Sequence, residues 1–228
     1  MLKERSTEIE IMDDLEISGP VVDQTLKELN TINKTLGGNQ ISISAFKRIA
    51  KGQQQLTLAD LGCGGGDIML QIAKWCRRAR IKLSCLGVDA NPNIIAYAKE
   101  NTKSHQEISY QPLNIFSQEF QQMKFDIVHC CLFLHHFTDE QLIKIFKTLK
   151  SQANIGVIIN DLHRHPVAYW SIKALTYVFS RSTMVRNDAA VSVARGFKRS
   201  ELIRILEQAG IQNFDLSWRW AFRWRLTF

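Results

Sequence analysis

Three alternating glycines between two carboxylates are the residues whose types and spacing point most directly to chemistry. Residues 59–67 read Ala-Asp-Leu-Gly-Cys-Gly-Gly-Gly-Asp. Apolar residues precede this run and a helical pattern follows it, so residues 56–62 are predicted to be a buried strand that turns into a helix at about residue 67. Residues 82–89 form a second apolar run that ends in Asp89, 22 residues after Asp67. Because open α/β sheets bind ligands at the carboxyl ends of their strands, these segments predict a nucleotide cradle.

The spacing of the glycines narrows the class of nucleotide. A dinucleotide fingerprint needs G-x-G-x-x-G, but here the glycines stand at Gly62, Gly64 and Gly66, and the required third position is Asp67. A P-loop is excluded because no Gly-Lys-Ser/Thr follows. The carboxylates of Asp60 and Asp67 would repel a pyrophosphate, whereas they could accept hydrogen bonds from a cationic or hydroxyl-bearing ligand.

The pattern Asp-x-Gly-x-Gly-x-Gly, with an acid ending the next strand, resembles the class I S-adenosylmethionine-dependent methyltransferases. The segment Gly-Phe-x-x-x-Glu-Leu, followed by Ala-Gly-Ile, over residues 196–211 is typical of the late helix and closing hairpin of that family. The resemblance covers about residues 56–228 and is greatest to the small-molecule branch that includes quinone and phenol methylases. It implies S-adenosylmethionine as cofactor and S-adenosylhomocysteine as product.

The resemblance also implies which residues contact the cofactor. Asp60, Gly62, Gly64 and Gly66 would form the turn against its methionine part, and Asp89 would accept both ribose hydroxyls, a role that suits an acceptor-only carboxylate. Ala90 would lie against the adenine, and Cys131 would face the amino-acid part. Where the family commonly has an Asp that accepts the adenine amino group, this chain has Asn114 followed by Ile115.

Length and composition indicate one soluble α/β domain with additions. The chain has 228 residues, of which 45% are hydrophobic and 22% charged. No apolar run is long enough for a membrane span, and the charged N-terminus does not resemble a signal peptide, so a cytoplasmic location is expected. The five cysteines lack zinc spacing and are expected to be reduced thiols, and no metal is expected.

Strands that alternate with helices predict a Rossmann-like, doubly wound sheet of seven mostly parallel strands with an antiparallel C-terminal strand. Residues 1–52 are expected to form an N-terminal helical cap, with a mobile lead-in over 1–19 and helices over 20–36 and about 42–51. The methyltransferase domain would then span 53–228. Residues 162–195 interrupt the alternation after the fifth strand, and this aromatic-rich insertion is expected to be a lid on the substrate pocket, a dimer surface or both.

Histidines at strand ends are the candidate bases for a methyl transfer. Asp161, His163, Arg164 and His165 follow the fifth strand, and His135 with His136 follows the fourth. Asp161 could fix a histidine tautomer, His163 or His165 could deprotonate an acceptor hydroxyl, and Arg164 could stabilise an oxyanion. His135 and His136 are less favoured as the base than the residues after the fifth strand. A purely structural role of residues 161–165, in which they cap the sheet and anchor the insertion, agrees with the sequence equally well.

The function expected is methylation, at oxygen, of a small and largely apolar acceptor of phenolic, quinol or polyketide type. The net charge of +7 and the alternating Arg and Trp residues over 218–225 leave RNA or protein methylation as an alternative. The favoured interpretation of that alternation is structural, a strand with a buried aromatic face and a solvated basic face. Nucleic acid is therefore not expected as a partner. A cofactor-binding scaffold without activity is the third possibility, and a homodimer is left open.

Overall fold

Apolar strands that alternate with amphipathic helices build a single sheet in the order β3-β2-β1-β4-β5-β7-β6. The computed structural model describes residues 2–228. β7 is antiparallel to both β5 and β6, and the pairs β1–β2, β1–β4, β2–β3 and β4–β5 are parallel. The predicted fold class, a seven-stranded mostly parallel sheet with an antiparallel C-terminal strand, is therefore confirmed.

The element bounds follow the sequence patterns closely. The strands are β1 Gln55–Leu61, β2 Lys82–Asp89, β3 Ile108–Pro112, β4 Phe125–Cys131, β5 Ala153–Leu162, β6 Asp215–Arg219 and β7 Arg223–Thr227. The α-helices are α1 Pro20–Thr35, α2 Gly38–Ile49, α3 Asp67–Ala79, α4 Pro92–Thr102, α5 Gln118–Gln121, α6 Asp139–Gln152, α7 Pro166–Phe179, α8 Thr183–Arg195 and α9 Arg199–Gln208. Two 3-10 helices are η1 Ile11–Asp13 and η2 Leu134–His136.

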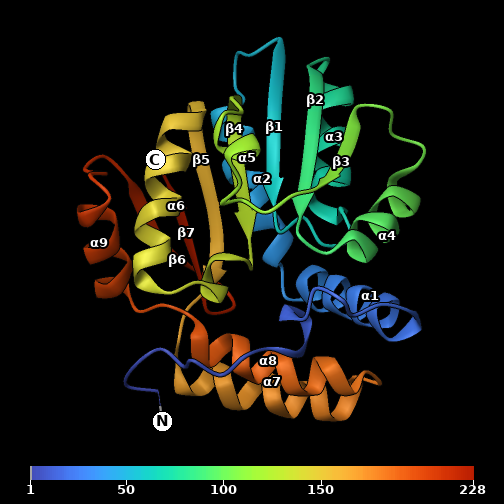
Figure 1. The fold of residues 1–228 in the computed structure, drawn as a ribbon, viewed down its shortest axis with the longest axis vertical. Helices are drawn as coiled ribbons and strands as arrows, with labels where there is room; N and C mark the ends of the chain where they lie inside the picture. Colours follow the sequence, from blue (N-terminus) through green and yellow to red (C-terminus); the bar gives the residue numbers. More distant parts are fainter. Residues whose placement is uncertain (1) are drawn as a thin grey trace.

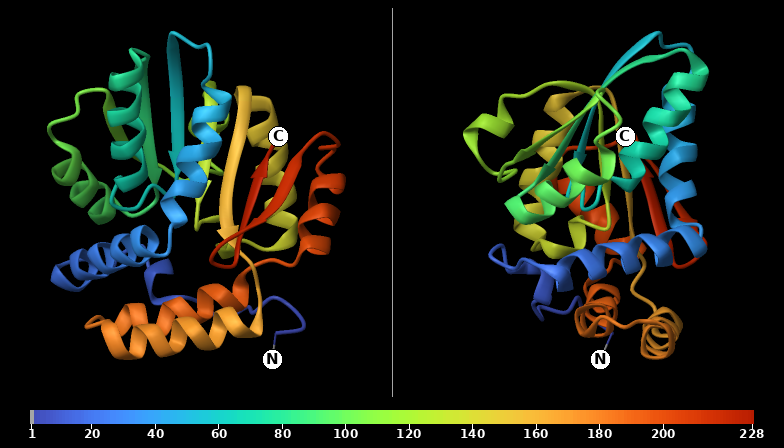
Figure 2. Two further views of the ribbon diagram at one scale, coloured as in Figure 1. Left: turned by 180° about the vertical axis from the view of Figure 1, so that it is seen from behind. Right: turned by 90° about the vertical axis from the view of Figure 1, so that its right-hand side faces the viewer.

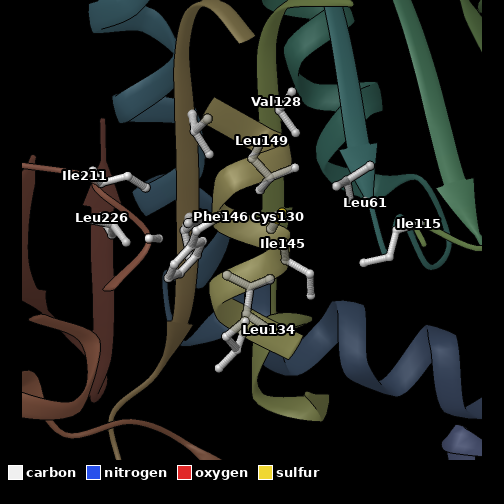
Figure 3. Packing of buried hydrophobic residues seen from close by; sticks show 14 of the residues in the cluster. Leu61, Ile115, Val128, Cys130, Leu134, Ile145, Phe146, Leu149, Ile211 and Leu226 are labelled. Atoms are coloured by element: carbon white, nitrogen blue, oxygen red, sulfur yellow. The ribbon is translucent and has the colours of Figure 1, made fainter. Parts of the chain in front are cut away.

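Helices cover both faces of the sheet (Figure 2). On one face, side chains of α2, α3 and α4 pack with β1 and β2 around Phe46, Leu58 and Met69. On the other, α5, α6 and α9 pack with β4, β5 and β7, and Figure 3 shows Phe146, Leu149 and Leu226 in this cluster. α2, which the sequence assigned to an N-terminal cap, is thus one of the helices that cover the sheet, and the division at residue 52 stays a prediction.

A third group of elements lies beyond the carboxyl ends of the parallel strands. Figure 1 shows α1 and the pair α7–α8 below the tips of β1, β4 and β5. α7 and α8 are the insertion after β5, and they pack against each other through Tyr169, Ala190 and Val193. The outer face of α7 exposes several large apolar side chains. These are Val167, Trp170, Tyr177, Val178 and Phe179.

The expected mobile lead-in does not match the described residues 2–19, which are anchored across the molecule; Met1 lies outside the described residues. Arg5 pairs with Asp139 at 2.8 Å and donates to the carbonyl oxygens of His135 and Phe137. Glu10 is buried and accepts a hydrogen bond from Ser192 of α8 at 2.6 Å. These contacts are with residues more than 100 positions away, so no local pattern in the sequence announces them.

The C-terminal hairpin corrects the expected division into a buried aromatic and a solvated basic face. Trp224 is buried as expected, but so is Arg223, whereas Trp218 and Trp220 are exposed. The prediction is wrong because adjacent side chains of β7, which point to opposite faces of the sheet, are both buried.

The five cysteines are free thiols, as expected. Cys63, Cys76, Cys85 and Cys130 are buried, and Cys131 is partly buried at the end of β4. Over residues 2–228, no helix has the length and apolar character that crossing a membrane requires.

Candidate active site

A cavity of about 470 Å³ lies at the carboxyl ends of β1, β2, β4 and β5. Its floor is the glycine turn with the ends of the strands, and its walls come from the N-terminal segment, α1, α7, α8 and the β6–β7 hairpin. Most of the wall is apolar. The apolar wall residues include Leu26, Leu29, Phe133, Ile172 and Leu175. The insertion therefore lines the cavity, and its role as a substrate lid stays a prediction.

The glycine turn gives the cavity its floor because its backbone takes conformations that side chains disfavour. Gly62, Gly64 and Gly66 all have positive φ, at 64°, 50° and 75°. A Cβ at Gly62 would collide with the ring of Phe133, and one at Gly66 with the hydroxyl of Tyr110. At Gly64 the nearest atom to such a Cβ is a Leu26 methyl 3.9 Å away, so this glycine faces open space.

Two carboxylates border the turn in different environments. Asp60 is buried and lies 2.6 Å from His129 Nδ1, while His129 Nε2 lies 2.8 Å from Ser42 Oγ. His129 is thus a satisfied buried histidine, as the sequence indicated. Asp89 accepts a hydrogen bond from the Asn91 amide at 3.0 Å, yet burial raises the pKa of Asp89. The hydrogen bonds that Asp89 accepts do not offset the effect of burial on its pKa. A ligand that donates hydrogen bonds to this carboxylate would stabilise its charged form.

The predicted cofactor contacts come together only in part. Asp60, Gly62, Gly64, Asp89 and Cys131 all line the cavity, and Gly66 begins α3 directly behind it. The other three residues lie outside the cavity wall, and their contacts with adenine stay predictions. Ala90 is exposed, Asn114 accepts a hydrogen bond from the Phe116 amide, and Ile115 belongs to the core cluster under α6.

Asp161 does position a histidine, but that histidine is His135. His135 Nδ1 lies 2.7 Å from Asp161 Oδ1, and its Nε2 lies 3.5 Å from Glu10 Oε1. Burial alone would lower the pKa of His135, but Asp161 and Glu10 outweigh it and raise that pKa to about 9. His135 is therefore protonated at neutral pH and cannot accept a proton from a substrate.

His136, beside it on η2, has a free ring edge. Its ring stacks on His135 with centroids 4.3 Å apart, and its Nδ1 lies 2.6 Å from Asp13 Oδ1. Burial would raise the pKa of Asp13, but His136 and Arg195 outweigh it and hold that pKa well below its ordinary value. The contact with Asp13 holds the Nδ1 side of the ring, so Nε2 lies on the side away from this carboxylate.

Glu10, His135 and His136 also place one ligand atom each within 4.8 Å of one another. Arg195 lies 3.4 Å from Glu10 and 2.6 Å from Asp13, so the carboxylates here already have cationic partners. Because His135 is protonated, it does not offer the neutral nitrogen that a metal requires. The group is an ion-pair network that ties η1 to η2 and α8.

The sequence's first candidates for catalysis lie elsewhere. Arg164 is buried and forms a two-pronged ion pair with Glu201 of α9, so its charge is already compensated. His165 begins α7 and accepts a hydrogen bond from the Val167 amide. His163 accepts one from the Trp218 indole at 3.2 Å. None of the three borders the cavity as described for residues 2–228, and the catalytic roles assigned to them stay predictions.

Sequence reasoning missed Glu10, Asp13, Arg195 and Arg223 at this site. Glu10 and Asp13 stand in a segment without periodicity, and Arg195 and Arg223 resemble ordinary surface residues in the sequence. Only the fold brings Glu10, Asp13 and Arg223 to the cavity and Arg195 against the two carboxylates. Burial of a charged residue has no signal in a single sequence.

Comparisons with known proteins agree with this site. Residues 58–156, which contain the glycine turn and β1 to β4, match the family model described as a methyltransferase domain. No curated protein matched the chain.

Solved structures share the fold at low sequence identity. Magnesium protoporphyrin IX methyltransferase from Synechocystis PCC 6803 with bound SAM is 16% identical, with 95% of this chain and 88% of that chain covered and a TM-score of 0.56. A putative O-methyltransferase from Nostoc punctiforme PCC 73102 is also 16% identical, with coverages of 95% and 67% and a TM-score of 0.62. The plantazolicin methyltransferase in complex with SAH is 17% identical, with coverages of 86% and 72% and a TM-score of 0.63.

The domain match places the glycine turn and Asp89 inside a methyltransferase domain. The strand order 3-2-1-4-5-7-6 supplies the rest of the fold. Together they show that residues 58–156 match a methyltransferase domain and that the chain has the fold of a solved methyltransferase with bound SAM.

Proposed function

We propose that the chain methylates an oxygen atom of a small, largely apolar acceptor. The observation that carries this proposal is the cavity of about 470 Å³, enclosed by apolar residues of α1 and α7 next to the glycine turn. Cavities of this size and character bind small organic molecules. The solved structures that share the fold include a magnesium protoporphyrin IX methyltransferase, a putative O-methyltransferase and a plantazolicin methyltransferase, and these support a small-molecule acceptor.

The residues of the glycine turn and the end of β2 are the ones that would bind the cofactor. Gly64 faces open space at the turn, and partly buried Asp89 is suited to accept hydrogen bonds from the ribose hydroxyls. S-Adenosylmethionine, when bound, supplies an activated methyl group. The protein's own work is then to hold the acceptor, exclude water and remove one proton.

His136 is the side chain that can remove this proton. Asp13 holds the Nδ1 side of its ring, and Nε2 is left to accept a proton from an acceptor hydroxyl. His136 borders the cavity, whereas His163 and His165 lie outside its wall. The protonated His135 behind it favours a negatively charged oxygen in the cavity.

The alternating Arg and Trp residues give less support to a nucleic-acid substrate. Arg225 pairs with Asp215 at 2.8 Å, and Arg223 is buried at the cavity, so two of the three arginines do not offer a free surface charge. A protein that binds phosphates needs such charges on its surface. Steeply salt-dependent binding of RNA would favour the alternative over a small acceptor.

The first experiment titrates the purified protein with S-adenosylmethionine, S-adenosylhomocysteine and NADH by calorimetry. We expect micromolar binding of the first two and none of NADH. A panel of phenols and quinols is then screened for formation of S-adenosylhomocysteine. Binding without turnover on any acceptor would support the scaffold interpretation, and absence of binding would contradict the proposal.

The second experiment assigns the base. We expect His136→Ala to lower kcat by about 10²-fold or more while S-adenosylhomocysteine still binds. Asp13→Asn should lower kcat less and shift the pH profile of kcat, because Asp13 acts through His136. His163→Ala and His165→Ala serve as comparison variants, and loss of turnover in these two with full activity of His136→Ala would return the role to the sequence's first candidates.

Oligomeric state and location stay predictions. The sequence leaves a homodimer through the N-terminal helices or the insertion open, and an interface on the insertion would bury the exposed apolar side chains of α7. Sedimentation that shows only monomer would dispose of the homodimer. A cytoplasmic location is proposed on the same footing, supported by the free thiols.

A further inference from the structure

Arg223 is the only lysine or arginine among the cavity-lining residues of the described chain. It stands at the start of β7 and is 5% exposed. Its Nη2 donates to Asn33 Oδ1 of α1 at 2.7 Å, whereas its buried Nη1 has no hydrogen-bond partner within residues 2–228. The guanidinium is thus only partly satisfied.

The charge of Arg223 also lacks a counter-ion. Arg164 and Arg195, the other buried arginines, pair with Glu201 and with Glu10 and Asp13. For Arg223, no carboxylate of the described residues comes within the 4.0 Å of a salt bridge. The ionisable groups that favour its charged form are the Cys131 thiol of β4 and Asp161 of β5.

An unpaired buried guanidinium is costly, and arginine cannot relieve this cost by losing its proton. A carboxylate from a ligand would relieve it, because the planar fork of the guanidinium matches a carboxylate with two parallel hydrogen bonds. Asn33 and Asn39 border the cavity together with Arg223 and add amide donors.

We propose that Arg223 is a carboxylate-binding subsite of the cavity. The proposal rests on the proposed function, since the carboxylate belongs to one of that reaction's two ligands. It is either the carboxylate of the cofactor's methionine part or one carried by the acceptor. In the second case the acceptor is an acidic molecule, such as an aromatic acid.

The test uses Arg223→Gln in the full chain, with Arg219→Gln of the same hairpin as the matched control. The first arm measures binding of S-adenosylhomocysteine and of 5′-methylthioadenosine, which lacks the carboxylate. If the cofactor supplies the group, Arg223→Gln weakens S-adenosylhomocysteine at least 10-fold and leaves methylthioadenosine unchanged, and Arg219→Gln changes neither.

The second arm measures thermal unfolding with benzoate and with benzamide, with and without S-adenosylhomocysteine. If the acceptor supplies the carboxylate, benzoate raises the Tm of the wild type more than benzamide does. That difference disappears in Arg223→Gln and persists in Arg219→Gln, while S-adenosylhomocysteine binds all three proteins equally.

Stability separates a binding role from a structural one. A subsite residue without a counter-ion can be replaced without loss of stability, so Arg223→Gln should unfold at the same or a higher temperature than the wild type. The proposal is overturned if neither arm distinguishes Arg223→Gln from Arg219→Gln, or if Arg223→Gln lowers the Tm by more than a few degrees. Failure of the proposed function shows separately, as absent binding or turnover in the wild type.

Discussion

Acid–histidine pairs hold the ends of β4 and β1 beneath the cavity. Asp161 accepts from His135 and also from the backbone amide of Leu134 at 2.8 Å, so one carboxylate fixes both the ring and the turn that carries it. Burial would raise the pKa of Asp161, but His135 and these amides lower it to about 2. Both partners of this pair are therefore charged over a wide range of pH.

This pair predicts how stability depends on pH. The folded pKa of His135, about 9, lies above the unfolded value of 6.5, so its contribution is complete below pH 6.5 and is lost as the pH rises through 9. For Asp161 the folded value is about 2 and the unfolded value 3.8, so its contribution is present above pH 3.8 and is lost toward pH 2. The pair should stabilise the protein fully between these limits, from about pH 4 to about pH 6.5.

Thermal unfolding of the wild type and His135→Gln between pH 6 and pH 9.5 tests this. The wild type should exceed the variant in Tm by on the order of 5 °C at pH 6, and the difference should shrink toward pH 9.5. A difference that stays constant across this range would contradict the ion pair.

At the scale of residues, the sequence predicted the chemistry of the turn better than the chemistry of the base. Gly62, Gly64 and Asp89 are close in sequence to the elements that place them, so their spacing was sufficient. The proposed base pairs with Asp13, a residue 123 positions away, and such a partner has no local pattern. Asp161 contacts His135, whereas the sequence pattern favoured His163 or His165 as its partner.

Among the elements, the glycine turn between β1 and α3 tolerates the fewest residue types, because its backbone has positive φ angles. Gly64→Ala and Gly66→Ala both place a side chain at positive φ, which costs about 1 kcal/mol each. Only at Gly66 would the new Cβ also collide with a neighbour, the Tyr110 hydroxyl.

We therefore expect Gly66→Ala to lower the Tm markedly more than Gly64→Ala. Gly64→Ala should instead fold well and weaken S-adenosylhomocysteine binding by about 10-fold or more, since its methyl group enters the space against the turn. Thermal unfolding and calorimetry on the two variants measure this separation, and equal losses in both assays would contradict it.

The order of elements was predictable because each strand and helix of the sheet carries its own period of apolar residues. The arrangement of α1, α7 and α8 over the strand ends was not, since it depends on contacts between distant segments. β7 shows the limit of a local pattern. Its alternating residues predict a strand, but the segments that pack on its two faces decide which of its side chains are buried.

Across the whole molecule, the N-terminal segment is tied over the cavity by buried charges. Arg195 of α8 binds Glu10 and Asp13 and donates to the His136 carbonyl at 2.7 Å, so it joins three segments that are distant in sequence. Removing one partner from such a network leaves the others buried and uncompensated.

Arg195→Gln should therefore destabilise the fold by about 3–5 kcal/mol. Arg204→Gln breaks an exposed pair with Asp139 and is the matched control, with little change expected in Tm. Thermal unfolding of both variants measures the contrast. A wild-type Tm in Arg195→Gln would show that the network does not hold the segment.

The cysteine side chains are buried or partly buried, so the rate at which their thiols are modified reports on the folded state. Burial raises the pKa of Cys76 to about 11 and that of Cys131 to about 12, so little thiolate exists at pH 8 and alkylating agents react slowly with the folded protein. Four of the thiols lie in the core and become reactive only when the fold opens. Cys131 lies in the cavity wall, so occupancy by a ligand shields it further. Cys63 also lines the cavity, so the rates of modification at Cys63 and Cys131 report the cavity, while the other three report the fold.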